Sequence, residues 1–261
     1  NGNTLPDECD LASGASTGVA RPSAAEAAQL SAAASAAGRH VGVNHNLLFN
    51  ATVRKLVTAV RARRLGELEH LSVTWNVPLR QLQTTSQHGH WIFETPANIL
   101  LEQAVHPLSM VQFLLGDLER LSVLSTGARP LSTGATFHRT WQISMTLQRG
   151  TAQILLSFGR EFREMRVLAI GQDGSASLDL AKNTLLLRTN GFQEPPLDDL
   201  VEGVGEGLGL AGQAAGNFAR TVLGMVKARP PFDPFGDSIA GSVSALPIET
   251  RSTRREKGSA Q

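Results

Sequence analysis

The chain of 261 residues is long enough for one large or two ordinary domains, and its 41% hydrophobic and 18% charged residues are typical of a globular protein. A formal net charge of +1 gives no electrostatic reason to expect a nucleic acid or an anionic membrane as partner. Cys9, the one cysteine of the sequence, excludes an intrachain disulfide, and no signal peptide or membrane-spanning apolar stretch is apparent, so we expect a cytoplasmic protein.

The N-terminal part of the chain predicts a helix followed by a short strand. Residues 1–20 show no helical or strand periodicity and do not begin with Met, so we expect that something upstream is missing. Residues 23–38 are rich in alanine, with a Ser23/Glu26 capping box at the start and glycine at the end, and predict a helix. The apolar residues 41–43 predict a buried strand after it, as in an α/β unit.

The next segments change from helical to strand periodicity. Residues 50–65 predict a helix with valine and leucine on one face and a basic face that is most simply solvated. Residues 71–79 alternate between apolar and polar side chains, which predicts a strand buried on one face. Residues 102–115 predict a further helix that ends at Gly116.

The second half of the chain predicts an antiparallel meander and a long helix. The expected strands cover residues 137–147, 152–158, 162–170, 175–180 and 184–188. A helical region follows over residues 198–229, and residues 247–261 predict a disordered tail or linker. These elements favour helices packed on one face of an antiparallel sheet.

Three short patterns imitate known sites without the context that those sites need. Residues 207–212 match the dinucleotide fingerprint, but an acidic stretch precedes them where a strand is required, so close helix packing or an interrupted helix start is the simpler interpretation. Residues 14–18 imitate a nucleophile elbow without its preceding hydrophobic strand. His88, His90 and His106 have no third ligand fixed by spacing, so we expect no metal site.

His106 has the most informative context of the histidines. Glu102 and Ser109 are four and three residues away from it, on one helical edge if the helix begins early enough. Pro107 is typical of a first helical turn, so His106 is expected at the helix entrance, where an imidazole can face a cleft. A structural histidine remains the alternative.

The order of several short motifs resembles that of one enzyme family. The motifs are Ala20-Arg21-Pro22, Val43-Asn44-His45-Asn46, Arg64-Leu65-Gly66-Glu67-Leu68, Glu102-Gln103-Ala104-Val105-His106 and Leu114-Leu115-Gly116. With the Ala-rich helix and the alternating strand between them, residues 18–190 resemble the glucose-fructose oxidoreductase / inositol dehydrogenase / rhizopine-catabolism family, Gfo/Idh/MocA.

The resemblance implies a mixed α/β and α+β fold class. Residues 1–45 would be the C-terminal remnant of an NAD(P)-binding Rossmann domain. Residues 46–246 would form a substrate-binding and oligomerisation domain with a mostly antiparallel sheet, and residues 247–261 a tail or linker. The Gly-rich turn that receives the pyrophosphate would lie upstream, so the isolated chain would bind NAD or NADP weakly or not at all.

The resemblance also assigns site residues. The family's Glu-Lys-Pro motif falls on Ala20-Arg21-Pro22, so both of its functional residues are replaced, and Arg21 would serve as an electrostatic clamp with a guanidinium that shuttles protons poorly. Arg21 and Pro22 would contact the cofactor. His106 would be the catalytic acid/base. The implied substrate-binding residues are Glu102, Gln103, Asn44, His45, His90 and Trp91.

The function implied by the resemblance is hydride transfer between nicotinamide and a sugar- or polyol-type substrate, in an enzyme of which this chain is a truncated form. A homo-oligomer through the open face of the sheet is also implied. The alternative is a catalytically silent relative that serves as a binding or oligomerisation module, because the Glu and Lys of the family motif are both lost.

Overall fold

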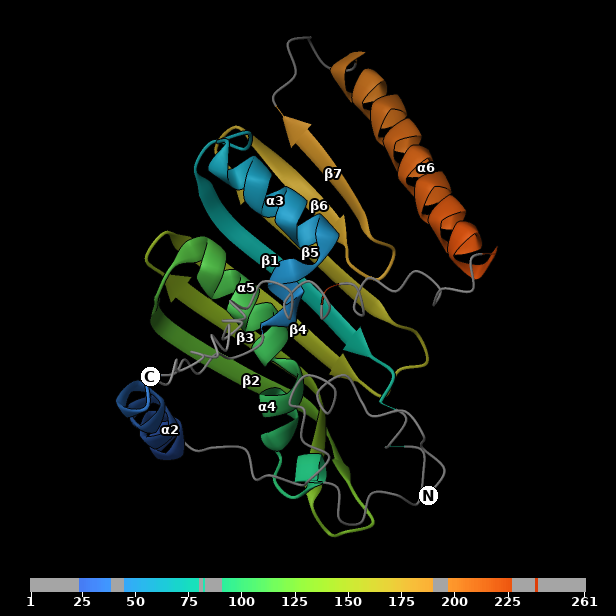
Figure 1. Ribbon diagram of the computed structural model, residues 1–261. Helices are drawn as coiled ribbons and strands as arrows, with labels where there is room; N and C mark the ends of the chain where they lie inside the picture. Colours follow the sequence, from blue (N-terminus) through green and yellow to red (C-terminus); the bar gives the residue numbers. More distant parts are fainter. Residues whose placement is uncertain are drawn as a thin grey trace, which may run out of the picture.

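The computed structural model describes residues 24–38, 45–79, 82, 91–189, 197–226 and 238. Figure 1 shows a seven-stranded sheet in the order β2-β3-β4-β1-β5-β6-β7. The strands are β1 (Leu68–Val77), β2 (Leu118–Pro130), β3 (Thr136–Leu147), β4 (Gly150–Phe158), β5 (Glu164–Gly171), β6 (Gly174–Asp179) and β7 (Thr184–Thr189). The helices are α2 (Ala24–Ala36), α3 (Ala51–Arg61), α4 (Asn98–Gln103), α5 (Val105–Leu115) and α6 (Leu197–Val226), with 3-10 turns η1 (Asn46–Phe49) and η4 (Trp91–Phe93).

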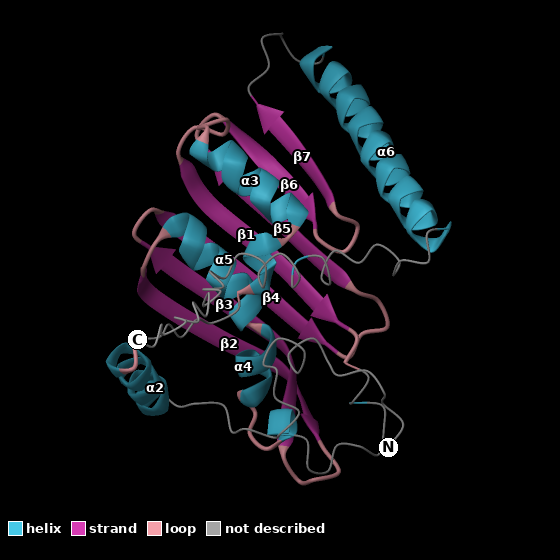
Figure 2. Cartoon of the chain, in the orientation of Figure 1, coloured by secondary structure: helices cyan, strands magenta, loops and turns pink. Residues whose placement is uncertain are grey.

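Helices α3, α4 and α5 cover one face of the sheet (Figure 2). Helix α5 lies on β1 and β4, and α3 lies toward β6 and β7. The side chain of Asn50 caps α3 by accepting hydrogen bonds from the backbone N–H groups of Thr52 at 3.0 Å and Val53 at 3.4 Å. The predicted layer of helices on one face of a mostly antiparallel sheet is therefore confirmed.

The core lies between this helix layer and the sheet. Alternate residues of the strands point into it, as Leu71, Val73 and Trp75 do from β1. Leu56 of α3 and Met110 of α5 meet them from the helices and are fully buried. The alternation predicted for residues 71–79 and for the later strands is confirmed.

The predicted simple meander is wrong in one respect. Strand β1 lies between β4 and β5, so β4 and β5 are not neighbours although they follow each other in the chain. β1 runs parallel to β4 and antiparallel to β5. Gly150 begins β4 with φ of 149°, and a Cβ there would lie 2.2 Å from the carbonyl oxygen of Glu69, so this close approach to β1 requires glycine.

Two further elements differ from the prediction. The helix expected over residues 102–115 is divided into α4 and α5 at Ala104, and it begins at Asn98. β2, which was not predicted, pairs with β3 along its whole length and forms one edge of the sheet. The expected strand 41–43 and the tail 247–261 lie outside the described residues.

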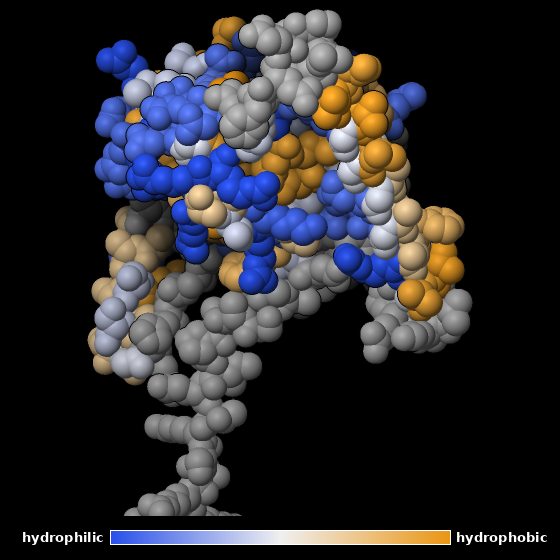
Figure 3. Space-filling model, turned by 90° about the horizontal axis from the view of Figure 1, so that it is seen from above, coloured by the Kyte–Doolittle hydropathy of each residue, from blue (hydrophilic) through white to orange (hydrophobic). Residues whose placement is uncertain are grey.

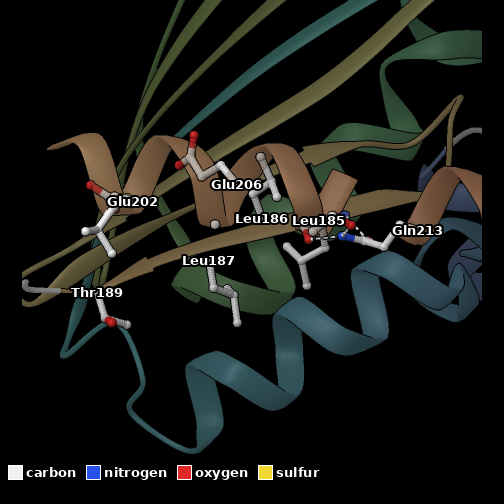
Figure 4. Close-up of a pocket in the computed structure, with 10 residues that line it drawn as sticks. Leu185, Leu186, Leu187, Thr189, Glu202, Glu206 and Gln213 are labelled. Carbon is white, nitrogen blue, oxygen red and sulfur yellow. Dashed lines mark hydrogen bonds between the residues drawn. The ribbon is translucent and has the colours of Figure 1, made fainter. Parts of the chain in front are cut away.

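Helix α6 protects the opposite edge of the sheet. The amide of Gln213 accepts from the backbone N–H of Leu185 and donates to its carbonyl oxygen, both at 2.9 Å, as a neighbouring strand would (Figure 4). Asn217 donates to the carbonyl oxygens of Lys182 and Asn183 at 2.9 and 3.1 Å. These side chains therefore satisfy backbone groups of β7 and of the turn before it, and the edge groups of β7 could otherwise pair with another chain.

The fingerprint-like residues 207–212 lie inside α6 and form neither a strand nor a turn, which confirms that the match is accidental. The small residues do not interrupt the helix. They also do not serve close packing within the described chain: a Cβ on Gly203, Gly207 or Gly212 would meet nothing within 4 Å, and one on Gly209 would lie 3.8 Å from Leu186. Within the described residues, no helix is both long and apolar enough to cross a membrane.

Candidate active site

His106 is the second residue of α5, with Pro107 beside it in the first turn, as predicted from the sequence. The imidazole faces the C-terminal part of β1, where the rings of His106 and Trp75 stack with centroids 6.0 Å apart and planes 21° apart. The His106 side chain is half-buried. The helix entrance and the strand beneath it thus fix the plane of the imidazole.

Trp75 joins this site to α4. It is 1% exposed, and its indole N–H donates to Oε1 of Gln103 at 3.3 Å. A buried indole N–H needs such a partner, and the bond holds the last residue of α4 next to His106. Sequence reasoning had not singled out Trp75. The sequence indicates a special role for Trp75 only in one way: its indole N–H lies on the buried face of a predicted strand, where it needs a hydrogen-bond partner.

Burial lowers the pKa of His106 below its ordinary value. The carboxylate of Glu102 opposes this shift, and the imidazole of His45 adds to it. Glu102 and His45 are therefore close enough to His106 to act on it electrostatically. The lowered pKa keeps the imidazole neutral near pH 7, and a neutral imidazole can accept a proton from a substrate hydroxyl.

The lowered pKa makes stability depend on pH. In the unfolded chain an exposed imidazole binds a proton below about pH 6.5, whereas His106 in the folded chain resists protonation until the pH is lower. The unfolded state then binds more protons, so stability falls as the pH drops through about 6.5.

Urea unfolding measured from about pH 7 to about pH 5 should therefore show a smaller loss of stability for His106→Gln than for the parent chain. All other residues are the same in the two proteins, so the difference between the two slopes reports the loss of the His106 imidazole. Equal slopes would show that folding leaves the proton affinity of His106 unchanged.

The structure brings together four of the residues predicted for the site: Glu102, Gln103, His45 and His106. Trp91 lies in η4, where its carbonyl oxygen accepts from the Asn98 side chain at 2.6 Å. Arg21, Pro22, Asn44 and His90 lie outside the described residues.

The residues expected on one helical edge, Glu102, His106 and Ser109, are divided between two consecutive helices. Glu102 lies on α4 and the other two on α5. The hydroxyl of Ser109 donates to the backbone carbonyl of His106 at 2.8 Å and so serves the helix backbone. Ala104, at the division, keeps helical backbone angles, and Glu102 still acts electrostatically on His106.

A cavity of about 470 Å³ lies elsewhere, between β7 and α6 (Figure 4). Leucines of β7 form its floor, and Glu202, Glu206 and Gln213 extend from α6. None of the residues grouped around His106 lines it. The cavity is a wide, open gap between α6 and the edge strand β7.

Residues 53–177 match the family model described as the GFO/IDH/MocA C-terminal domain. This range runs from the first turn of α3 into β6 and includes Trp75, Gln103 and His106. A search of curated proteins gave no match.

Several solved structures share the fold. An NAD binding oxidoreductase from Klebsiella pneumoniae is 17% identical with a TM-score of 0.53, over 67% of this chain and 49% of that one. The WlbA dehydrogenase from Bordetella pertussis, in complex with NADH and UDP-GlcNAcA, is 16% identical with a TM-score of 0.52, over 83% of this chain and 63% of the dehydrogenase. An oxidoreductase from Agrobacterium radiobacter, in complex with NAD+, L-tartaric acid and magnesium, is 12% identical with a TM-score of 0.51, over 84% of this chain and 64% of the oxidoreductase.

This chain spans less than two thirds of the length of each of these three structures. At these identities the similarity establishes a shared fold, and a fold hosts many functions. The family match is independent of the structural similarity and covers the same sheet and helices. Residues 53–177 therefore form a GFO/IDH/MocA C-terminal domain.

Proposed function

We propose that this chain is part of an NAD(P)-dependent oxidoreductase that transfers hydride between nicotinamide and a sugar- or polyol-type substrate. In it, residues 46–246 bind the substrate, residues 1–45 are the end of a cofactor domain, and residues 247–261 are a tail or linker. The single cysteine of the sequence is in keeping with a cytoplasmic enzyme.

The observation that carries the proposal is the environment of His106. Its imidazole is held against Trp75, and its lowered pKa makes it a base at neutral pH. A carbinol that loses hydride must also lose its hydroxyl proton, and His106 accepts that proton. Glu102, Gln103 and His45 lie around the imidazole, where their polar groups can bind further hydroxyls, and Asn44, His90 and Trp91 complete the proposed substrate set.

The described residues do not themselves fit a dinucleotide. A pyrophosphate needs a Gly-rich turn between a strand and a helix N-terminus, and the matching residues 207–212 lie inside α6. Arg21 and Pro22 are the residues proposed to reach the nicotinamide side. The choice between NAD and NADP belongs to the cofactor domain.

A second copy of the chain is the proposed partner at the open face of the sheet. Leu155, Leu168 and Ile170 point away from the helix layer and are 36%, 40% and 39% exposed. They lie among serine, threonine and glutamine side chains of the same face. Such a face is suited to a symmetric contact between two sheets.

The alternative of a silent binding module rests on the replacement of the family's Glu and Lys by Ala20 and Arg21. Purifying the full reading frame that contains this chain, and assaying reduction of NAD and NADP with a panel of UDP-sugars, aldoses and inositols, separates the two. Turnover supports the oxidoreductase, and Arg21→Lys should then raise the rate. Sugar binding by calorimetry without turnover in the parent or in Arg21→Lys would favour the silent module.

A further inference from the structure

Trp75 is the buried side chain that joins the two helices of the candidate site. Figure 3 shows hydrophobic residues along the margin of the molecule where α6 lies in Figure 1, whereas Trp75 is 1% exposed. Its ring stacks on His106 of α5, and its indole N–H donates to Oε1 of Gln103, the last residue of α4, at 3.3 Å. One side chain of β1 therefore contacts a polar residue of each helix.

Trp141 of β3 offers a comparison within the same sheet. It is also buried, and its ring lies against that of His138, with centroids 5.5 Å apart. Its indole N–H, however, donates to the backbone carbonyl oxygen of His138 at 3.1 Å. A backbone acceptor requires no particular residue, whereas the bond of Trp75 requires a glutamine side chain from another element and orders it. The indole of Trp75 therefore acts on a specific side chain.

The bond between Trp75 and Gln103 decides which end of the amide faces the indole. An indole N–H is a donor only, so it bonds to the amide oxygen and cannot bond to the amide NH2 group. The NH2 group is thereby turned away from the indole. Among the described residues no hydrogen bond involves this group, and Gln103 is only half-buried, so the NH2 group can bind a ligand.

The groups around His106 need a donor. The His106 nitrogen that takes up the substrate proton and the carboxylate of Glu102 are both hydrogen-bond acceptors. The imidazole of His45 can donate or accept, according to its tautomer. A sugar oxygen with no hydrogen, such as a ring oxygen or the carbonyl oxygen that oxidation produces, can only accept. The NH2 group of Gln103 is a donor at any pH, and it complements these acceptors.

We propose that Trp75 is a positioning residue of the site: its indole N–H turns the Gln103 amide so that the NH2 group donates to an oxygen of the substrate beside His106. This role rests on the proposed function. The bound oxygen is a hydroxyl, ring or carbonyl oxygen of an uncharged part of the substrate, because the carboxylate of Glu102 repels a substrate carboxylate.

The hydrogen bond from Trp75 lowers the cost of binding. A glutamine side chain that is not held has several rotamers, and either end of its amide can face a ligand, so binding has to order it. Trp75 is a rigid support for this purpose, because its strand lies between two hydrogen-bonded neighbours in the middle of the sheet. Gln103 is therefore oriented before the substrate arrives.

The first test observes the bond in the 261-residue chain by nuclear magnetic resonance, without any assay of activity. The three tryptophans of the sequence give three indole N–H signals. Gln103→Leu should shift the signal that is missing from Trp75→Phe and speed its exchange with solvent. It should leave in place the signal that is missing from Trp141→Phe. An unchanged Trp75 signal in Gln103→Leu would overturn the proposed role.

The second test is a double-mutant cycle on KM in the full reading frame, with a substrate identified by the panel. Gln103→Leu should raise KM by about 3- to 10-fold, the effect of one lost hydrogen bond, and change kcat by less than about twofold. Trp75→Phe should raise KM by a similar factor, because phenylalanine keeps a ring against His106 but releases the amide. The double variant should have the KM of Gln103→Leu alone, since Trp75 acts through Gln103.

Trp141→Phe is the matched control, because it removes an indole N–H of the same sheet away from the site. It should leave KM unchanged in the parent and in Gln103→Leu, and circular dichroism checks that every variant is folded. Independent effects of Trp75→Phe and Gln103→Leu, or an unchanged KM in either, would overturn the role of Trp75.

A parent without turnover would contradict the proposed function instead. The same cycle is then measured on the dissociation constants of the sugars by calorimetry, where the same non-additivity supports the role of Trp75. A parent that neither turns over nor binds any sugar of the panel would overturn both proposals.

Discussion

Phe137→Ala is expected to lower the free energy of unfolding by about 3–5 kcal/mol. Phe137 of β3 is 1% exposed and makes edge-to-face contacts with Phe93 at 5.8 Å and with Phe158 at 6.2 Å between ring centroids. Its ring therefore joins β3, β4 and η4. Alanine removes the buried apolar surface and the aromatic contacts together, and the close-packed neighbours cannot fill the space. Urea unfolding followed by circular dichroism measures the difference.

Phe162→Ala is the matched control, because it removes the same side chain at a position that is 55% exposed. Its effect should stay within about 1 kcal/mol, as for most surface substitutions. If the two variants unfold at the same urea concentration, the ring of Phe137 does not hold the three elements together. A change in the slope of the transition would indicate an altered unfolded or native state instead.

His106→Gln should lower kcat by about 10²- to 10⁴-fold in the full reading frame, if the proposed function is right. Glutamine keeps a polar side chain of similar reach, but it cannot take up a proton near neutral pH. Substrate binding should change little, because Glu102, Gln103 and His45 remain. Steady-state kinetics with a substrate identified by the panel separates kcat from KM.

His70→Gln makes the same chemical change on the opposite face of the sheet, where the His70 ring lies 2.8 Å from the hydroxyl of Thr151. It should leave kcat as in the parent. Nearly full activity in His106→Gln would remove His106 from the chemistry and leave it a structural histidine. The pH profile of the parent should lose activity on the acidic side, below the ordinary imidazole pKa, because burial lowers the pKa of His106.

The sequence predicted those elements in which one face is buried and the other solvated. Strand β3 buries Phe137, Trp141 and Ile143 on one face, so its alternation is readable in the residues themselves. β2 is exposed on both faces and pairs only with β3 among the described strands, so its residues carry no alternation. The position of β1 between β4 and β5 depends on contacts between distant segments, which local periodicity does not encode.

The candidate site was predictable only in part, for the same reason. Pro107 placed His106 at a helix entrance, because proline favours a first turn wherever it occurs. Trp75 has the same periodicity as Val73, and nothing local distinguishes a tryptophan that stacks on an imidazole from one that fills a core. The division at Ala104 was also hidden, because Ala104 itself has helical backbone angles.

The central position of β1 sets the order in which the sheet can form. The neighbours of β1 are β4 (residues 150–158) and β5 (residues 164–171). During synthesis, β1 is therefore complete more than 70 residues before either neighbour has been translated. Hairpin β3–β4 can close early, but the sheet is joined into one only when β1 is inserted. Such long-range pairing slows folding. A nascent chain that ends before β4 exposes the apolar face of β1, a point at which aggregation or chaperone binding competes with folding.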